Sequence, residues 1–476
     1  MMTRFTTDLV IGLEVHVELD TNTKLFCGCS RKPEPGKEDE PNSRTCPTCL
    51  GHPGSKPVLN GQAVEFAVKL CLAAGCDIAP QLIFSRKSYF YPDMAKNYQI
   101  TQYELPLGMH GAVRLSNGKL IRLTRIHMEE DPASLVHPAG MRESGYVLVD
   151  YNRSGNPLVE IVTEPDLASA DEARDFMRKL LSILEYLEIF DATTGIIKAD
   201  ANVSVQESGY TRVEIKNITG FKEIERALVH EIKRQQAAVT EGKKIVQETR
   251  AWDAEQGMTH SLRKKEQEED YGYIIDPDLV ATDIPSSYLE KLREELPELA
   301  AQKVERYITE HNIKKEDADV LAAEKDLAEL YERVARHINP ALAAKWLRRE
   351  LTRVLNFNEK ILREVNLDEK NLIELLSLVE QRKITDKIGQ KLMEMLVAKP
   401  FNVKEYVKKE NLETLQDASE LEAICKQVVT ENPAAVADYK KGEEKALNFI
   451  IGKVMQKTRG KATPQEVQEI VKKILS

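Results

Sequence analysis

The sequence predicts an α+β fold, in which a mixed N-terminal region precedes helical C-terminal regions. Three observations lead to this prediction. Residues 8 to about 290 combine alternating, strand-like runs with helices and Gly/Pro turns. From Leu296 onward the pattern is almost wholly helical and rich in charge, and prolines at 277, 285 and 297 mark the change. At 476 residues the chain is too long for one hydrophobic core, so several domains are expected.

Two changes of pattern divide the chain. The first lies near residue 290, and the second follows Lys399-Pro400-Phe401, where another set of helices begins. We therefore predict domains over residues 1–292, 293–405 and 406–476.

The first strand is predicted from a period of two. Between Leu9 and Leu19 every odd position is aliphatic, which places Glu14, His16 and Glu18 together on the other face. Side chains two residues apart on one face stand roughly 7 Å apart, so neighbours can share a metal ion or a metal–phosphate cluster. A solvated sheet face is the alternative.

Two further acidic segments strengthen the metal interpretation. Residues 127–131 read His-Met-Glu-Glu-Asp, with Glu129 and Glu130 beside an imidazole. Glu160 lies inside the aliphatic run 158–162, where a carboxylate is costly unless it is paired or bound to metal. Oxygen-rich ligand sets with an imidazole suit Mg²⁺ or Mn²⁺ better than zinc.

A basic and aromatic segment covers residues 86–100. Its cations suit a polyphosphate and its rings suit stacking on a base, although such loops also occur at protein interfaces. The nucleotide-binding candidates are Arg86, Lys87, Tyr89, Tyr91, Asp93, Lys96 and Tyr98.

Four of the seven cysteines form two close pairs. Cys27 and Cys29, then Cys46 and Cys49, predict a four-thiolate structural zinc site, which has no open coordination position for catalysis. The alternative is a loop of reduced cysteines without metal. An odd number of cysteines excludes a disulfide framework that uses all of them.

Two helices are marked by capping boxes, and both are predicted to serve packing. Ser169 to Glu172 begins one, and Thr463 to Glu466, with Pro464 at the first helical position, begins the other.

The net charge of −10 argues against broad electrostatic binding of nucleic acid. Locally, however, the only charged residues between positions 446 and 465 are Lys453, Lys457, Arg459 and Lys461. This run is either a solvated helix face or a contact with RNA phosphates. No apolar run reaches the roughly 20 residues of a membrane span, and no secretory cleavage site is evident, so we expect a cytoplasmic protein.

The chain resembles the GatB family, the B subunits of the aspartyl/glutamyl-tRNA amidotransferase. The resemblance rests on motifs that span nearly the whole chain in the family's order: IGLEVHVEL (11–19), RKSYFYPDMAKNYQI (86–100), HMEED (127–131), NRSGNPLVEIVTEPD (152–166), KADANVS (198–204), EIKN (214–217) and GKVMQKTRGKATPQEV (452–467).

The resemblance implies a cradle domain with an antiparallel-rich sheet, a helical domain and a small YqeY-like tail that engages tRNA. It implies ATP and Mg²⁺ as cofactors and mischarged Glu-tRNA(Gln) or Asp-tRNA(Asn) as substrate. The implied partners are a glutamine amidase (the A subunit), which supplies ammonia, and a small stabilising C subunit. The family's catalytic metal ligands match Glu14, His16, Glu129, Glu130 and Glu160.

The chain departs from the family pattern in two places. It has Pro132-Ala133-Ser134 where many relatives carry a lysine. Gly272 and Ile274 lie in a segment that has the sequence DYRYFPEPD in many relatives. Two other functions stay open, those of a non-catalytic tRNA-binding assembly protein and of a GatE-like enzyme. The acidic residue set argues against a pure binder, and the insert expected of GatE is missing.

Overall fold

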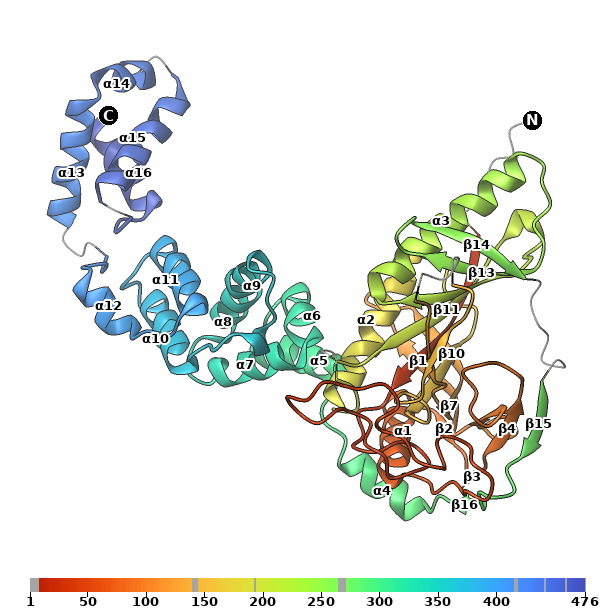
Figure 1. The fold of residues 1–476 in the computed structure, drawn as a ribbon. Coiled ribbons are helices and arrows are strands. Elements are labelled where there is room, and N and C mark those ends of the chain that lie inside the picture. Colours follow the sequence, from red (N-terminus) through yellow and green to blue (C-terminus); the bar gives the residue numbers. More distant parts are fainter. Residues whose placement is uncertain are drawn as a thin grey trace. The chain divides into compact units, whose positions relative to one another are not determined.

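The computed structural model describes residues 8–138, 144–191, 194–263, 271–414, 418–440, 442–458 and 460–475. The chain forms two compact units, Met1–Leu299 and Ala300–Ser476. The first contains all of the described strands, and the second is helical (Figure 1). The predicted α+β class is therefore confirmed. The three-domain division stays a prediction, although the first unit ends close to the predicted residue 292.

The first unit is built on a nine-stranded sheet. Every pair of neighbouring strands is antiparallel except β12 and β13. The strand order is β14 (Met258–Arg263), β13 (Glu248–Asp253), β12 (Val213–Thr219), β11 (Ile197–Val205), β1 (Leu9–Glu18), β10 (Pro157–Thr163), β7 (Leu120–Glu130), β6 (Gly108–Arg114) and β2 (Asp77–Ile78). The N-terminal strand thus lies in the middle of the sheet.

Smaller sheets complete the described strands of this unit. They are β15 (Gly272–Ile275) with β4 (Ser85–Ser88) and β5 (Tyr98–Thr101), β16 (Thr282–Asp283) with β3 (Gln81–Leu82), and β8 (Ser134–Val136) with β9 (Leu148–Asp150).

Helices pack against one face of the large sheet. They are α1 (Gly61–Ala73), α2 (Ala170–Tyr186) and α3 (Phe221–Thr240), and α4 (Ser286–Glu294) packs against α1. A 3-10 turn follows β11 at Gln206–Ser208. Aliphatic residues at the odd positions of β1 join the helices' apolar residues in one core. The Ser169 side chain accepts a hydrogen bond from the Glu172 N–H at the start of α2, as the capping box predicts.

The second unit consists of short helices. In chain order they are α5 (Ala300–His311), α6 (Lys315–Ala323), α7 (Lys325–Ala335), α8 (Pro340–Trp346), a π-helical segment (Leu347–Leu351), α9 (Thr352–Phe357), a 3-10 turn (Leu362–Glu364), α10 (Glu369–Glu380), α11 (Asp386–Ala398), α12 (Val403–Lys409), α13 (Ala418–Glu431), α14 (Pro433–Lys440), α15 (Glu444–Lys457) and α16 (Pro464–Leu475). Two separate hydrophobic clusters stabilise them. One extends to Val407, with Leu412 packed against it, and the other begins at Leu421.

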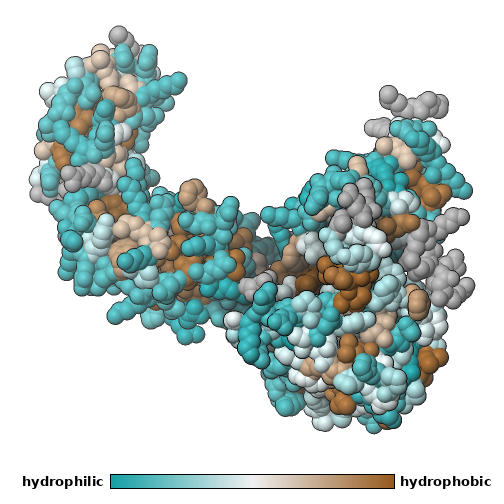
Figure 2. Space-filling model, in the orientation of Figure 1, coloured by the Kyte–Doolittle hydropathy of each residue, from teal (hydrophilic) through white to brown (hydrophobic). Residues whose placement is uncertain are grey.

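Figure 2 shows a mostly hydrophilic surface with hydrophobic patches on the visible faces of both units. Among the described residues, no helix combines the length and the apolar character that crossing a bilayer requires.

Candidate functional site

A row of polar side chains crosses the face of the large sheet that faces away from the helices. His16 in β1 lies opposite Glu160 in β10 and opposite Lys198 in β11. Glu160 in turn lies opposite His127 in β7. Directly opposed residues in antiparallel strands project to the same face. The strand register therefore brings together residues that are far apart in the sequence.

Two of these side chains, His16 and Glu160, form a compact donor group with Glu129. His16 Nε2 is 3.5 Å from Glu129 Oε1 and 3.3 Å from Glu160 Oε2. One potential ligand atom from each of the three residues lies within 4.8 Å of the other two. This set of two carboxylates and one imidazole fits a hard divalent cation such as Mg²⁺ or Mn²⁺.

Burial and neighbouring charges set the protonation of this group. Burial opposes a charge on His16, but the hydrogen bond to Glu160 and the charges of Glu129, Glu160 and Asp200 prevail and raise the pKa of His16 to about 10. Burial, with the charge of Glu160, raises the pKa of Glu129 to about 7. Burial lowers the pKa of His127 to about 4, so that imidazole is neutral at pH 7.

The other two predicted metal ligands lie elsewhere. Glu130 is adjacent to Glu129 on the same strand and so points to the opposite face. Its carboxylate accepts hydrogen bonds from Lys96 Nζ at 2.6 Å and from the Ile100 N–H at 2.9 Å. Glu14 belongs to a second acidic group with Asp200 and Glu214.

The second acidic group contains its own cation. Lys216 Nζ lies 3.0 Å from Asp200 Oδ2 and 3.7 Å from Glu214 Oε1. Burial opposes the charge of Lys216, but the carboxylates of Asp200, Glu214 and Glu14 raise its pKa above the ordinary value. The Asn202 amide donates to Glu14 at 3.1 Å.

A cavity of about 270 Å³ opens over the polar row. Its lining combines carboxylates, ammonium groups and a histidine, which is the composition expected for a polyphosphate and metal site. The lining residues are His16, Glu18, Lys87, Tyr89, Gln99, Glu129, Asp131, Pro132, Leu158, Glu160, Ile196, Lys198, Asp200 and Lys216.

Several of these residues were not among the predicted site residues, although a signal for them exists. Lys198 and Asp200 alternate with buried Ala199 and Ala201 in β11, the same period of two that marked β1. Asp131 also lines the cavity, and burial raises its pKa to about 6.

The basic and aromatic segment divides into structural and cavity-facing residues. Arg86 forms ion pairs with Asp276 at 2.9 Å and Asp278 at 3.0 Å, and it lies over the Tyr98 ring. Lys96 is paired with Glu130.

Of the seven nucleotide-binding candidates, Lys87 and Tyr89 line the cavity. The Lys87 ammonium lies 4.8 Å from the centre of the Tyr271 ring. Tyr91 is half exposed. Asp93 has a buried oxygen without a hydrogen-bond partner among the described residues, and burial raises the pKa of Asp93.

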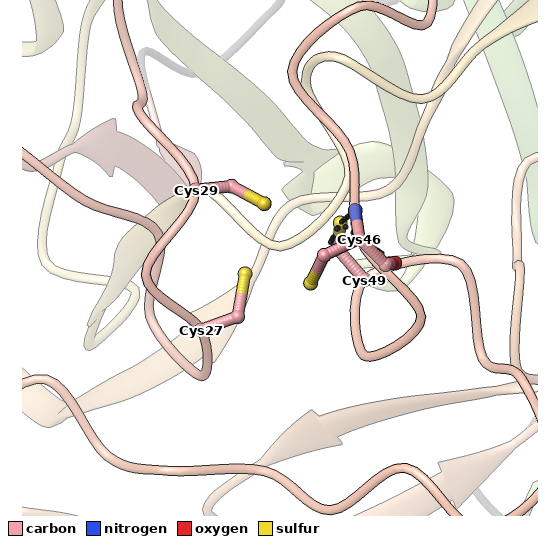
Figure 3. A group of neighbouring side chains, drawn as sticks. All are labelled: Cys27, Cys29, Cys46 and Cys49. Carbon is pink, nitrogen blue, oxygen red and sulfur yellow. Dashed lines mark hydrogen bonds between the residues drawn. The ribbon is translucent and has the colours of Figure 1, made fainter.

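The four clustered cysteines converge as their spacing predicts. Figure 3 shows Cys27 and Cys29 facing Cys46 and Cys49 across two loops. The four sulfurs lie within 4.8 Å of one another, and those of Cys46 and Cys49 are 3.9 Å apart. A tetrahedral zinc with Zn–S bonds of about 2.3 Å requires sulfur separations of roughly 3.8 Å. The geometry therefore fits a single metal ion.

The cysteine loops pack against the turn at residues 151–156, which is also connected to the cavity. Ser154 Oγ donates to the Cys49 carbonyl at 3.1 Å, and the fully buried Lys24 donates to the Tyr151 carbonyl at 3.1 Å. Gly155, at φ +84°, donates its N–H to the carbonyl of Asp131 at 2.8 Å. The cysteine loops and the Asp131 edge of the cavity thus share one turn.

The basic run of the tail is partly neutralised. Lys457 pairs with Glu431 at 2.9 Å, and Lys453 lies over the ring of Phe449. Arg459 lies outside the described residues. The loop at Gly460 accepts a hydrogen bond from Thr385 Oγ1 at 2.7 Å, which joins it to the start of α11.

A largely buried carboxylate and imidazole set beside lysines, on a mostly antiparallel sheet, is typical of proteins that bind anionic groups together with a hard cation. The known families that this chain matches give a more specific assignment than the site geometry does. Residues 9–290 match the model described as the GatB/GatE catalytic domain, and residues 329–475 match the model described as the GatB domain.

Curated relatives match along the whole chain. The chain is 42% identical to the B subunit of aspartyl/glutamyl-tRNA(Asn/Gln) amidotransferase from Carboxydothermus hydrogenoformans, over 98% of both chains. It is 43% identical to the protein of the same name from Caldanaerobacter subterraneus subsp. tengcongensis, over 98% of this chain and 99% of the relative. The chain belongs to the GatB family of tRNA-dependent amidotransferase subunits.

Proposed function

We propose that this chain is the part of a tRNA-dependent amidotransferase that activates the side-chain carboxylate of Glu-tRNA(Gln), Asp-tRNA(Asn) or both with ATP and then directs its amidation. The observation that carries the proposal is the convergence of His16, Glu129 and Glu160 from three strands beside the lysines of one cavity. A pure tRNA-binding protein has no need of this donor set. The curated relatives, matched along nearly their whole length, favour a GatB over a GatE-like protein.

The chemistry requires no protein nucleophile. The substrate carboxylate attacks the γ-phosphorus of ATP, ADP leaves, and an acyl phosphate forms. Ammonia then attacks the acyl carbon and inorganic phosphate leaves, which gives the amide after loss of a proton. His16, Glu129 and Glu160 would hold Mg²⁺, which supplies charge neutralisation for the phosphoryl group. Lys87 and Tyr89 line the same cavity and would contact the nucleotide.

The predicted residues that lie outside the donor group of His16, Glu129 and Glu160 have structural roles in this proposal. Glu130 and Lys96 fix the segment that carries Tyr98, since Glu130 also binds the Ile100 N–H. Arg86, through Asp276, attaches β4 to the chain beyond β15. Glu14 completes the acidic group around Lys216. Cys27, Cys29, Cys46 and Cys49 would bind one structural zinc that fixes their loops.

The partners follow from the same assignment. A glutaminase, the A subunit, would deliver ammonia, and a small C subunit would complete a heterotrimer. The proposed domain division assigns the cradle to residues 1–292, the helical domain to 293–405 and a tRNA-binding tail to 406–476.

The test uses the assembled complex with each mischarged tRNA, ATP and glutamine. We expect Gln-tRNA or Asn-tRNA to form, with ADP released. Glu160→Gln removes a negative charge from the donor group and should abolish ADP release that depends on aminoacyl-tRNA. Glu241→Gln alters an exposed carboxylate at the end of α3 and serves as the matched control. Undiminished ADP release by the Glu160 variant would refute the assignment.

A further inference from the structure

The cavity contains three lysines, and their surroundings differ. Lys216 is held by Asp200 and Glu214 in the second acidic group. Lys87 lies against aromatic rings, 4.8 Å from the centre of Tyr271 and 5.9 Å from that of Tyr89. Lys198 also lines the cavity, and its ammonium forms no hydrogen bond or close ion pair with the described residues, although its charge acts on the carboxylates of Asp93 and Asp131.

Apart from Asp93, which has a buried oxygen without a hydrogen-bond partner among the described residues, the carboxylates around Lys198 have other partners. Glu18 binds Arg31 at 2.9 Å, and Asp131 lies 3.3 Å from Arg153. Glu129 and Glu160 face His16. An ammonium group in a partly enclosed site has three donors to satisfy, so this arrangement leaves Lys198 suited to an anionic ligand.

The strand register specifies where that ligand would lie. Lys198 is the direct cross-strand neighbour of His16, and such neighbours have Cβ atoms roughly 5 Å apart on the same face. His16 in turn contacts Glu129 and Glu160. An anion that reaches both this donor group and the Lys198 ammonium therefore lies over β1, between the donor group and β11. In phosphoryl transfer, the group that needs cations on two sides is the transferred phosphoryl group.

We propose that Lys198 is a catalytic residue that binds the γ-phosphoryl group of ATP from the β11 side of His16, while His16, Glu129 and Glu160 would hold the metal. The inference rests on the proposed function and adds to it the residue that contacts the transferred group. Lys198 donates hydrogen bonds to the γ-phosphoryl oxygens as the bond to ADP breaks and the bond to the substrate carboxylate forms. The lysine keeps its protons throughout.

The test compares nucleotides that differ only in the γ-phosphate. Lys198→Met removes the charge and keeps the apolar stem, Lys198→Gln keeps a donor without charge, and Lys198→Arg keeps the charge. Calorimetry with the full-length chain and Mg²⁺ measures binding of ADP and of a non-hydrolysable ATP analogue. Loss of a hydrogen bond to a charged group should weaken binding of the analogue roughly 10-fold to 100-fold in the Met and Gln variants.

The remaining expected results are equally specific. In the Met and Gln variants, the affinity for ADP should stay within about twofold of that of the unmodified chain. The Arg variant should recover most of the affinity for the analogue. Lys222→Met, on the exposed surface of α3, is the control and should bind both nucleotides as the unmodified chain does. Equal weakening of ADP and analogue would show a general effect on the cavity and overturn the proposal. So would unchanged analogue binding with a raised KM for mischarged tRNA, because Lys198 would then bind the substrate carboxylate. An unmodified chain that binds neither nucleotide would instead overturn the proposed function itself.

Discussion

Binding of a divalent ion at His16, Glu129 and Glu160 should release a proton, so the metal affinity should rise with pH. A metal binds the neutral imidazole, whereas the pKa of His16 in the metal-free chain is raised to about 10. Burial opposes that rise, but the hydrogen bond to Glu160 and the nearby carboxylate charges outweigh it. Each pH unit below the pKa costs about 1.4 kcal/mol, or tenfold in affinity. At pH 7 the affinity should therefore be roughly a thousandfold below its limit at high pH.

The assay is calorimetric titration of the full-length chain with Mn²⁺ in two buffers of different ionisation enthalpy. At pH 8 we expect about one proton released per ion bound, and more below pH 7, where Glu129, with its pKa of about 7, adds to the release. His110→Asn changes an exposed histidine outside the cavity and should leave the result unaltered. Metal binding without proton release at pH 8, or with constant affinity between pH 7 and 9, would refute this account of His16.

Three further predictions concern other parts of the chain. Metal analysis should find about one zinc per chain, and a Cys46→Ser, Cys49→Ser double variant should lose that zinc. Zinc-free protein with four freely titratable thiols would contradict the zinc site. Glu14→Ala removes a carboxylate from the acidic group around Lys216 in the cavity, so it should abolish ATP-dependent activation with little change in thermal unfolding. Retained phosphorylation of aminoacyl-tRNA would remove Glu14 from the mechanism. Deleting residues beyond 413 leaves α12 intact, whose Val407 is buried. The deletion should raise the KM for mischarged tRNA and weaken the dependence of tRNA binding on salt. Equal tRNA affinity and equal salt dependence in the full-length and shortened chains would show that the tail lysines only form a solvated surface.

The sequence predicted what depends on local periodicity. Alternation in residues 9–19 correctly placed Glu14, His16 and Glu18 on one face of a strand, because a period of two follows from backbone geometry alone. The same rule applied to β7 separates Glu130 from Glu129, a consequence that we did not draw from the sequence.

Strand register was not predictable, and it determines which carboxylates meet. The pairing of Glu14 with Asp200, and of His16 with Lys198, joins residues more than 180 positions apart. No local pattern specifies such a pairing, so Lys198 was missed and Glu14 was grouped with His16. For the same reason, the ion pair between Arg86 and Asp276 could not be anticipated from the sequence, and a nucleotide-binding role for Arg86 stays a prediction.

The central position of β1 has a consequence for synthesis of the chain. Its two neighbours, β10 and β11, end at Thr163 and Val205, so the first strand leaves the ribosome long before either partner exists. At about 5–20 residues per second, β1 waits roughly 7–30 s with both hydrogen-bonding edges unpaired, and roughly 10–40 s until its second partner is complete. Such a segment is prone to pair with other chains. Newly made protein should therefore depend on chaperones that cover this strand until residue 205 has emerged, and pauses in translation between residues 20 and 200 should increase aggregation.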